Sequence, residues 1–407
     1  MLESRIPLPD TVRNPARRPS GPFSLQAWSW MSVLLLAVLA LYQLGYLAVY
    51  LAQQRGGAER MFGDFFAFWS FARFSHSFPA DRIYDLGALQ TFQQALPGGF
   101  RGFYPYPYPP IFLLYLWPLG ALGYLPALAL WSGGTLAAYI VAVVGHDWRS
   151  PRPWIAIAAP TTLLAVISGQ NGLLSAALMI GGLRILRRRP LLGGLLLGGL
   201  AFKPQLFVLA PLALIASRQW RGLLGLTASA VGLSAASVAA FGVEVWLRWF
   251  EAIPTLSQLV EANRERLSRL MPTLMASLLD AGAGRAPAEA LQGVAAAAVI
   301  ASLWLIFRRR PGAPRPLDAA ALQVGVFLVT PYAFIYDMPM VADAVTTALA
   351  EPAAPGRGRP LAETVILLAV LALPLIMMSG IAHGWPVGPV LLALAFMIIA
   401  RQGAASA

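Results

Sequence analysis

The sequence predicts an all-α polytopic membrane protein, and three observations support this fold class. Apolar residues make up 58% of the 407 positions and charged residues only 12%, whereas about a quarter of an ordinary soluble domain is charged. Apolar runs of helical length recur along the chain, and arginines cluster in the short breaks between them, as in the cytoplasmic loops of membrane proteins. We expect a bundle of about 11 to 13 transmembrane helices with short extracytoplasmic loop helices and with both termini in the cytoplasm. A cytosolic enzyme and a disordered chain are excluded.

The formal net charge of +12 is concentrated in these breaks. The arginine clusters are Arg184 with Arg187–Arg189, Arg218 with Arg221, Arg308–Arg310 with Arg315, and Arg357 with Arg359. Because this pattern belongs to loops beside a membrane, we expect membrane lipids and not nucleic acid as partners. The chain has no cysteine and three scattered histidines, so disulfides are excluded and we expect no metal site and no cofactor.

The apolar pattern divides the chain into a tail and one domain. Residues 1–21 are polar and rich in proline, which indicates a cytoplasmic tail, and 22–407 are expected to form a single transmembrane domain. The first apolar run, at about 27–52, is too long for a signal peptide and is expected to be a retained helix. It leads into a first extracytoplasmic loop at 53–108. Charged and apolar residues alternate at helical spacing in 244–286, which predicts a second extracytoplasmic, amphipathic region.

The first loop contains two segments, at 64–76 and 81–95, that are expected to be short interfacial helices. The loop passes into the proline-rich run Tyr104–Pro110. Since proline removes backbone donors and fixes φ, this run must be extended and must line something other than lipid.

Several apolar runs are too short to cross a membrane, and breaks fall at Gly169–Asn171 and at Lys203–Gln205. Such interrupted helices indicate half-crossing segments around a cavity. If the first loop is outside and the arginine clusters are inside, one run between 111 and 187 must be re-entrant, or two must merge.

Asp64 stands among aromatic residues just beyond the first apolar run. A poorly solvated carboxylate at a membrane boundary suits general-base chemistry. The alternative is an interfacial aspartate that caps a helix within an aromatic belt.

Lys203 is the only lysine of the chain and lies inside an apolar run. An ionisable residue at membrane depth usually faces a cavity or a charged partner. Its compact ammonium suits a phosphate ligand, and the alternative is that the side chain extends to the membrane interface.

Other polar residues have two readings each. Asp85 suits a sugar hydroxyl, or it pairs with a neighbouring arginine and caps the next turn. The amides of Gln170 and Asn171 suit a hydroxyl-rich ligand, or they form a turn and join helices. Tyr336 and Asp337 line the same cavity, or they form an ordinary turn.

Several motifs are absent from the sequence. There is no GxxxxGK[ST] loop and no HExxH motif, which argues against ATP-driven transport and against a zinc protease. Carboxylates are nearly missing from the apolar runs, which argues against an ion-coupled carrier.

The ordered set of motifs resembles the bacterial GT-C membrane glycosyltransferases of family 87, which include polyprenol-phosphate-mannose-dependent α-mannosyltransferases. The resemblance covers roughly 25 to 345 of the chain. The motifs that carry it are Gly63-Asp64-Phe65 with Trp69, Ile83-Tyr84-Asp85, Tyr106-Pro107-Tyr108-Pro109-Pro110, Gly169-Gln170-Asn171-Gly172, Phe202-Lys203-Pro204-Gln205 and Tyr336-Asp337.

The resemblance implies a GT-C-like bundle in a bacterial plasma membrane, with its active site on the extracytoplasmic side. It implies transfer of mannose or another hexose, with inversion, from a polyprenyl-phosphate donor to a lipid or glycan acceptor. Asp64 would be the general base, and Lys203, or an arginine of the outer loops, would bind the donor phosphate. The expected sugar- and acceptor-binding residues are Asp85, Tyr106, Tyr108, Gln170, Asn171, Gln205, Tyr336 and Asp337.

A non-catalytic carrier or flippase of lipid-linked sugars is the alternative function. Such a protein alternates between two access states and is often built from inverted repeats. The sequence shows no convincing repeat.

Overall fold

The computed structural model describes residues 64–97, 101–351, 359–380 and 383–405, and every regular element in these ranges is a helix. The predicted tail and the predicted first crossing helix lie outside the described residues. Together with the apolar character of the helices, this confirms the predicted fold class, an all-α polytopic membrane protein.

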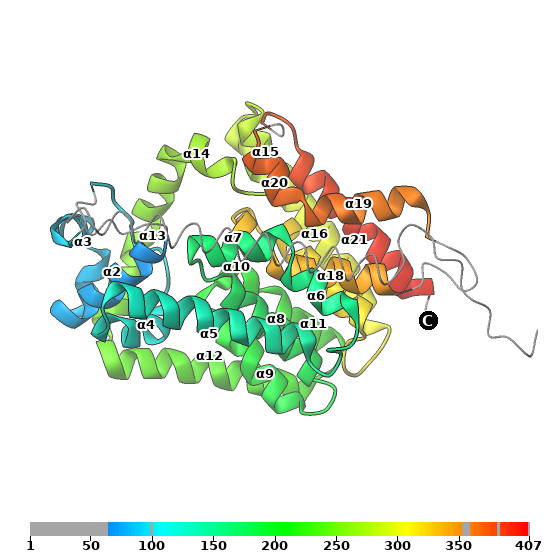
Figure 1. The fold of residues 1–407 in the computed structure, drawn as a ribbon, viewed down its shortest axis with the longest axis horizontal. Helices are drawn as coiled ribbons and strands as arrows, with labels where there is room; N and C mark the ends of the chain where they lie inside the picture. The colour runs from blue at the N-terminus through cyan, green and yellow to red at the C-terminus, as the bar shows by residue number, and fades with distance from the viewer. Residues whose placement is uncertain (1–63, 98–100, 352–358, 381–382, 406–407) are drawn as a thin grey trace, which may run out of the picture.

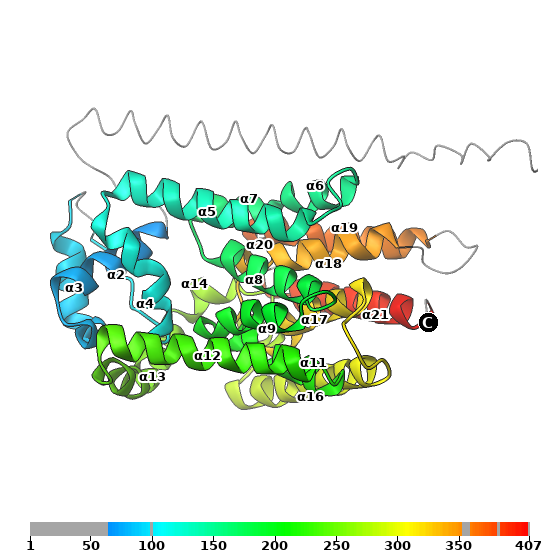
Figure 2. The same cartoon turned by 90° about the horizontal axis from the view of Figure 1, so that it is seen from below.

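Four of the described helices are long and apolar enough to cross a membrane. They are α5 (Tyr124–Val144), α12 (Trp220–Phe241), α16 (Arg285–Arg308) and α21 (Val387–Ala405). Helix α5 has 21 residues and is therefore about 31 Å long, close to the thickness of a hydrocarbon core of about 30 Å. Both α5 and α12 extend along the long axis of the molecule (Figures 1 and 2).

Shorter apolar helices fill the bundle. They are α6 (Pro151–Ile157), α7 (Pro160–Ser168), α8 (Gly172–Ile185), α9 (Pro190–Gly198), η4 (Gly199–Phe202), α10 (Pro204–Phe207), α11 (Leu209–Ala216), α17 (Pro316–Val329), η5 (Ile335–Asp337), α18 (Pro339–Ala350), α19 (Leu361–Leu371) and α20 (Leu373–Met378). Many begin with proline, which is favoured in the first turn because that turn needs no backbone donor. The predicted break at 169–171 is confirmed, since α8 begins directly after it, and the break predicted at 203–205 is confined to Lys203, because α10 begins at Pro204.

The segment before α5 forms a small aromatic layer at one end of the bundle. It contains α2 (Phe65–Ser77), η2 (Ala80–Tyr84), α3 (Leu86–Ala95), α4 (Ile111–Leu116) and η3 (Trp117–Ala121). The helix expected at 64–76 is confirmed by α2, but most of it is buried in an aromatic core and exposed residues occur only towards its C-terminal end. Its phenylalanines occur on every side of the helix, so α4, η3 and α5 surround it.

The apolar run at 111–122 forms α4 and η3 and is too short to cross a membrane. Helices α4 and η3 turn back on α2, where a Cβ at Gly120 would lie 2.6 Å from the Ala72 carbonyl oxygen. The His76 ring nitrogen Nε2 lies 2.9 Å from the Trp117 carbonyl oxygen. Only glycine permits this approach, and the chain enters α5 from the same end of the bundle.

The two ends of the bundle differ in chemistry. We call one the arginine end, and it contains 145–150, 186–189, 217–219 and 309–315. Here the Gly312 amide donates to the Ser217 carbonyl at 2.9 Å, and Arg188 Nη1 lies 2.8 Å from His146 Nε2. We call the other the Asp64 end, and it contains Asp64, 101–110, 169–171, 203, 263–273 and 330–338.

The amphipathic region predicted at 244–286 forms helices at the Asp64 end. They are α13 (Glu244–Ala262), α14 (Arg264–Ser268) and α15 (Leu274–Asp280). Figure 1 shows α13 and α14 arching from the end of α12 towards α15. The link after α14 is fixed to the bundle, because the Ile335 amide donates to the Leu270 carbonyl at 2.9 Å.

Candidate active site at the Asp64 end

Asp64 immediately precedes α2, and both of its carboxylate oxygens accept hydrogen bonds. Gln170 Nε2 donates to Oδ2 at 2.9 Å, and Tyr104 Oη donates to Oδ1 at 3.4 Å. The side chain makes no capping hydrogen bond to α2, so the alternative reading of Asp64 as a helix cap does not describe its contacts. The carboxylate is half-buried and is oriented by groups from two distant parts of the chain.

Glycine brings Gln170 to Asp64. Gly169 has a φ of +65°, and a Cβ at this position would lie 2.6 Å from Phe65 Cβ. The indole Nε1 of Trp131 donates to the Gly169 carbonyl at 3.0 Å. The turn between α7 and α8 is therefore held directly against the first residue of α2.

The amides at this turn are buried and incompletely hydrogen-bonded. Asn171 is fully buried, and neither its Oδ1 nor its Nδ2 has a hydrogen-bond partner among the described residues. Gln170 Oε1 is likewise without a partner there. Buried polar groups are nearly always paired, and an unpaired one costs about 1–3 kcal/mol. These amides are therefore candidates for ligand contacts.

The unpaired amides lie against the segment that carries Asp337. A Cβ at Gly172 would lie only 1.8 Å from the Tyr336 carbonyl oxygen, so the start of α8 touches η5. The Asn171 side chain acts to lower the pKa of Tyr108, so the amide lies beside the Tyr108 hydroxyl. No hydrogen bond of normal geometry joins the two groups. Residues 101–110, 169–172 and 335–337 thus meet at one place.

Lys203 forms a buried ion pair with Asp337. Its Nζ lies 2.5 Å from Asp337 Oδ1, and both side chains are almost fully buried. The same Nζ lies 5.7 Å from the centroid of the Tyr336 ring. The alternative that Lys203 extends to the membrane interface is thereby excluded, and the expectation of a charged partner is confirmed.

Two tyrosines of the 101–110 segment remain protonated across the physiological range. Burial, together with the charge of Asp64, raises the pKa of Tyr104 to about 12, although Arg266 acts in the opposite direction. Burial and the charges of Asp337 and Asp64 raise the pKa of Tyr108 well above its usual value. Both hydroxyls therefore keep their proton, and Tyr104 donates its own to Asp64.

The site lies below the end of the bundle. Trp131, which holds Gly169, is seven residues into α5, so the turn lies about 10 Å from the first residue of that helix. Helix α8 has 14 residues and a length of about 21 Å. Because α8 is short and begins inside the bundle, Asn171 lies below the end of the bundle.

Three predicted site residues lie outside this group. Asp85 accepts a hydrogen bond from the Ala88 amide at 3.0 Å and so caps α3, as its alternative reading expected. Tyr106 is buried in the aromatic layer, and its hydroxyl donates to the Pro109 carbonyl at 3.2 Å. Gln205 is half-buried in α10, and no hydrogen bond within the described ranges joins it to Asp64 or Lys203.

Sequence reasoning missed two residues near Asp64. Tyr104 is the first residue of the proline-rich run, and its place in that run was the available signal. Arg266 of α14 is exposed, and its charge acts to lower the pKa of Tyr104. Nothing in the local sequence distinguishes Arg266 from the other charged residues of 244–286.

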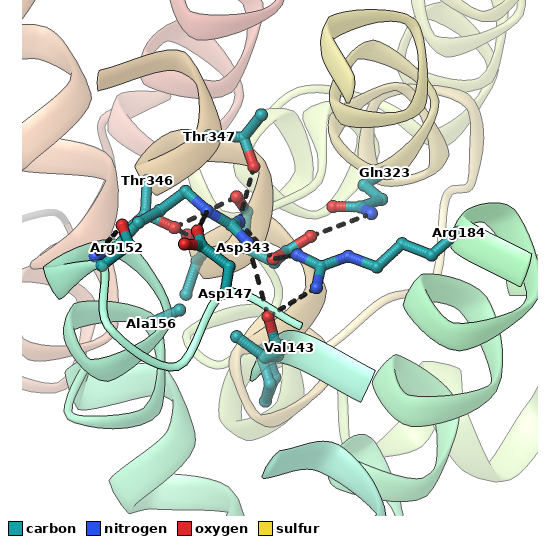
Figure 3. A network of polar contacts seen from close by, with 12 residues as sticks. Val143, Asp147, Arg152, Ala156, Arg184, Gln323, Asp343, Thr346 and Thr347 are labelled. Atoms are coloured by element: carbon teal, nitrogen blue, oxygen red, sulfur yellow. Dashed lines mark hydrogen bonds and ion pairs between the residues drawn. The ribbon is translucent and has the colours of Figure 1, made fainter. Parts of the chain in front are cut away.

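A second buried carboxylate was also missed. Asp343 lies within the apolar run 338–350, where it is paired with Arg152 and Arg184 (Figure 3). The expectation that apolar runs nearly lack carboxylates is therefore wrong for this helix. The two guanidiniums come from separate parts of the chain, so only the fold reveals the cluster.

The described residues include no group of three or more His, Cys, Asp or Glu side chains that could hold a metal ion. The polar groups that meet at the Asp64 end are instead a carboxylate, amides, tyrosine hydroxyls and one ion pair. This set suits a hydroxyl-rich ligand, because amides and hydroxyls both donate and accept hydrogen bonds.

A bundle of apolar helices with a recessed carboxylate at one end defines a membrane protein with a site for a polar ligand. The family model described as Glycosyltransferase family 87 matches residues 106–331, which is more than half of the chain. The chain therefore belongs to glycosyltransferase family 87 and is a membrane glycosyltransferase, as the resemblance in the sequence predicted. The matched region includes Asn171 and Lys203, whereas Asp64 lies before it and Asp337 after it. No curated protein and no solved structure matches the chain.

Proposed function

We propose that this glycosyltransferase moves mannose or another hexose from a polyprenyl-phosphate donor to a lipid or glycan acceptor at the Asp64 end of the bundle. The observation that carries the proposal is the juxtaposition of an oriented carboxylate, Asp64, with the buried and unpaired amide of Asn171. Glycosyl transfer needs a base for the acceptor and hydrogen bonds for the sugar, and these residues supply both.

Asp64 is the general base. It takes the proton of an acceptor hydroxyl while that oxygen attacks the anomeric carbon of the donor sugar. The bond between the anomeric carbon and the phosphate oxygen breaks, and polyprenyl phosphate leaves with the bonding electron pair. Attack from the face opposite the phosphate inverts the anomeric configuration. The hydrogen bonds from Gln170 and Tyr104 hold the carboxylate in position, which favours reaction by fixing geometry in advance.

The unpaired amides bind the sugar. The Asn171 side chain offers one acceptor and two donor hydrogens, and Gln170 Oε1 offers a further acceptor. Sugar hydroxyls would satisfy these groups, which explains why the chain tolerates them unpaired in the apo structure. Tyr108, which lies beside Asn171, is a third contact.

The departing phosphate needs positive charge, because negative charge builds on it in the transition state. Lys203 can supply it only in part, since Asp337 already neutralises its ammonium. One of the three ammonium donors points to Asp337, and the others remain for a phosphate oxygen. Arg266, near Tyr104, is the second cation and corresponds to the expected arginine of an outer loop.

The charges of the chain support one orientation in the membrane. The arginine clusters at the arginine end support a cytoplasmic position for that end, according to the positive-inside rule. The Asp64 end would then face the extracytoplasmic side of a bacterial plasma membrane. This is the side at which a polyprenyl-linked donor, rather than a nucleotide sugar, is the expected substrate.

The test is the Asp64→Asn variant, assayed as purified protein with polyprenyl-phosphate hexoses. Loss of a general base should lower the transfer rate by about 10²- to 10⁴-fold without lowering the thermal unfolding temperature. Glu289→Gln, which changes an exposed carboxylate of α16, is the matched control and should keep full activity. Full activity of Asp64→Asn would remove Asp64 from the mechanism, and lipid movement without any glycosylated product would favour the carrier.

A further inference from the structure

A second polar site lies between η2 and α13, separate from Asp64. It is a cavity of about 520 Å³, within the size range of small-molecule sites. Its charged and polar side chains come from both elements: Asp81, Arg82 and Asp85 on one side, and Arg248, Glu251 and Thr255 on the other. The Tyr84 hydroxyl, in the cavity wall, donates to the Tyr108 carbonyl at 2.7 Å, so the wall is joined to the segment that lines the active site.

Helix α13 presents two different faces. The cavity-lining residues Arg248, Glu251 and Thr255 are spaced by three and four positions and so share one face. A neighbouring face carries the exposed apolar side chains of Val243, Leu247, Phe250 and Ile253. A helix with this division lies in the membrane interface, with its apolar face towards lipid. The polar cavity therefore opens where water and lipid meet.

An apolar cavity adjoins the polar one. It has a volume of about 560 Å³ and shares Asp81 with its neighbour. Its walls are mainly hydrophobic and include Phe78, Trp117 and Phe241. Phe78 and Trp117 are exposed and offer an apolar surface at the mouth of this cavity. The two cavities together fit a molecule with a polar head and an apolar chain.

The charges that line the polar cavity favour a lipid whose polar head is uncharged. Three carboxylates and two guanidiniums line it, so a phosphate group would meet more negative than positive charge. Hydroxyl groups accept from guanidinium and donate to carboxylate, and a sugar satisfies both. Arg248 and Glu251 form an exposed ion pair at 2.9 Å. The guanidinium can donate to one sugar hydroxyl, and the carboxylate can accept from the next.

We propose that these two cavities bind a glycolipid, with its uncharged sugar head between η2 and α13 and its apolar chain against Phe78, Trp117 and Phe241. Ser75, at the edge of the apolar cavity, is eleven residues along α2 from Asp64, or about 16 Å. The apolar chain of the lipid therefore lies well away from Asp64, and only its sugar head could approach the carboxylate as an acceptor. Its role as the acceptor rests on the proposed transferase activity, whereas its binding does not.

The test uses the full chain in phosphatidylcholine nanodiscs that contain a small fraction of digalactosyldiacylglycerol. Retained lipid is counted by native mass spectrometry. Arg248→Ala should lower retention of the glycolipid at least fivefold. Arg264→Ala is the matched control, because it breaks an exposed Arg–Glu pair of the same spacing outside the cavity, and it should leave retention unchanged. Trp117→Ala tests the apolar half and should also lower retention.

The other arms identify the ligand. Phosphatidylglycerol, with its charged head, should not be retained above its bulk fraction, and free digalactose should compete far more weakly than the lipid. Equal retention by Arg248→Ala and the unchanged protein, or equal retention of phosphatidylglycerol, would overturn the site. Equal binding of free digalactose would overturn the role of the apolar cavity. Asp64→Asn should retain the glycolipid normally, so failure of the transferase mechanism and failure of this site give different results.

Discussion

Asp337 and Asp343 lie six residues apart on one segment, and both are buried and paired with cations, yet their surroundings differ. Asp343 Oδ1 accepts from Arg152 and from Arg184 at 3.0 Å each, and Oδ2 lies 3.4 Å from Gln323 Nε2 (Figure 3). These partners come from α6, α8 and α17. Both guanidiniums also donate to the Val143 carbonyl of α5. Asp343 thus joins five helices within one network.

Asp337 has one cationic partner, Lys203, and its neighbours include an amide that nothing in the described protein satisfies. The difference teaches how to separate structural from ligand-binding polar groups in an apolar bundle. A buried charge whose hydrogen bonds are made within the protein holds helices together. A buried amide that has neither its donor nor its acceptor paired, as at Asn171, costs the protein free energy and is a candidate for a ligand contact, whereas Gln323 of the Asp343 network leaves only its oxygen unpaired.

The largest effect is expected for Asp343→Ala. This change leaves Arg152 and Arg184 without their shared carboxylate, so we expect a loss of stability of about 3–5 kcal/mol. Thermal unfolding of the purified protein measures it. Transfer by the fraction that remains folded should be close to normal, and an unchanged unfolding temperature would contradict the structural role of the cluster.

The Lys203–Asp337 pair should behave differently when both partners are replaced. Lys203→Met or Asp337→Leu alone leaves a buried charge unpaired and should cost about 3–5 kcal/mol, whereas the double variant should recover most of this stability. The recovered protein should still transfer sugar poorly, because the ammonium is gone. Unfolding temperature and transfer rate are measured on the same preparation. A stable and fully active double variant would show that the pair is only structural.

The smallest effect on stability, with the opposite sign, is expected for Asn171→Leu. Leucine has a similar shape and removes the unpaired donor and acceptor, so the apo protein should become more stable by about 1–3 kcal/mol. The loss of sugar hydrogen bonds should nevertheless lower kcat/KM by about tenfold, since each bond contributes about 0.5–1.5 kcal/mol. Thermal unfolding measures the expected gain in stability, and steady-state kinetics measure the expected loss in kcat/KM. A drop in stability would make Asn171 a structural residue like Asp343.

The sequence predicted the fold class well because composition alone requires a membrane. Polar residues and glycine at 169–171, and the Lys203-Pro204 pair, also located two breaks between helices. The sequence did not reveal that 111–122 folds back on α2, since this run is as apolar as its neighbours. That outcome depends on the contact between Gly120 and α2, and a long-range contact leaves no local pattern.

The candidate site was predicted in part. Asp64, Gln170, Asn171, Lys203 and Asp337 stood out because each interrupts an apolar or aromatic context, and the structure brings them to one end. The pairing of Lys203 with Asp337 could not be read from the sequence, because 134 positions separate them. Arg152 and Asp343 were missed for the same reason.

The shortness of α8 has a consequence for side reactions. Its C-terminal end lies at the arginine end, and its length of about 21 Å falls about 9 Å short of a hydrocarbon core. If the donor binds as we propose, its sugar–phosphate bond breaks beneath the level of the lipid headgroups, where competing water is scarce. In such a site, transfer of the activated sugar to the acceptor is favoured over its hydrolysis by water.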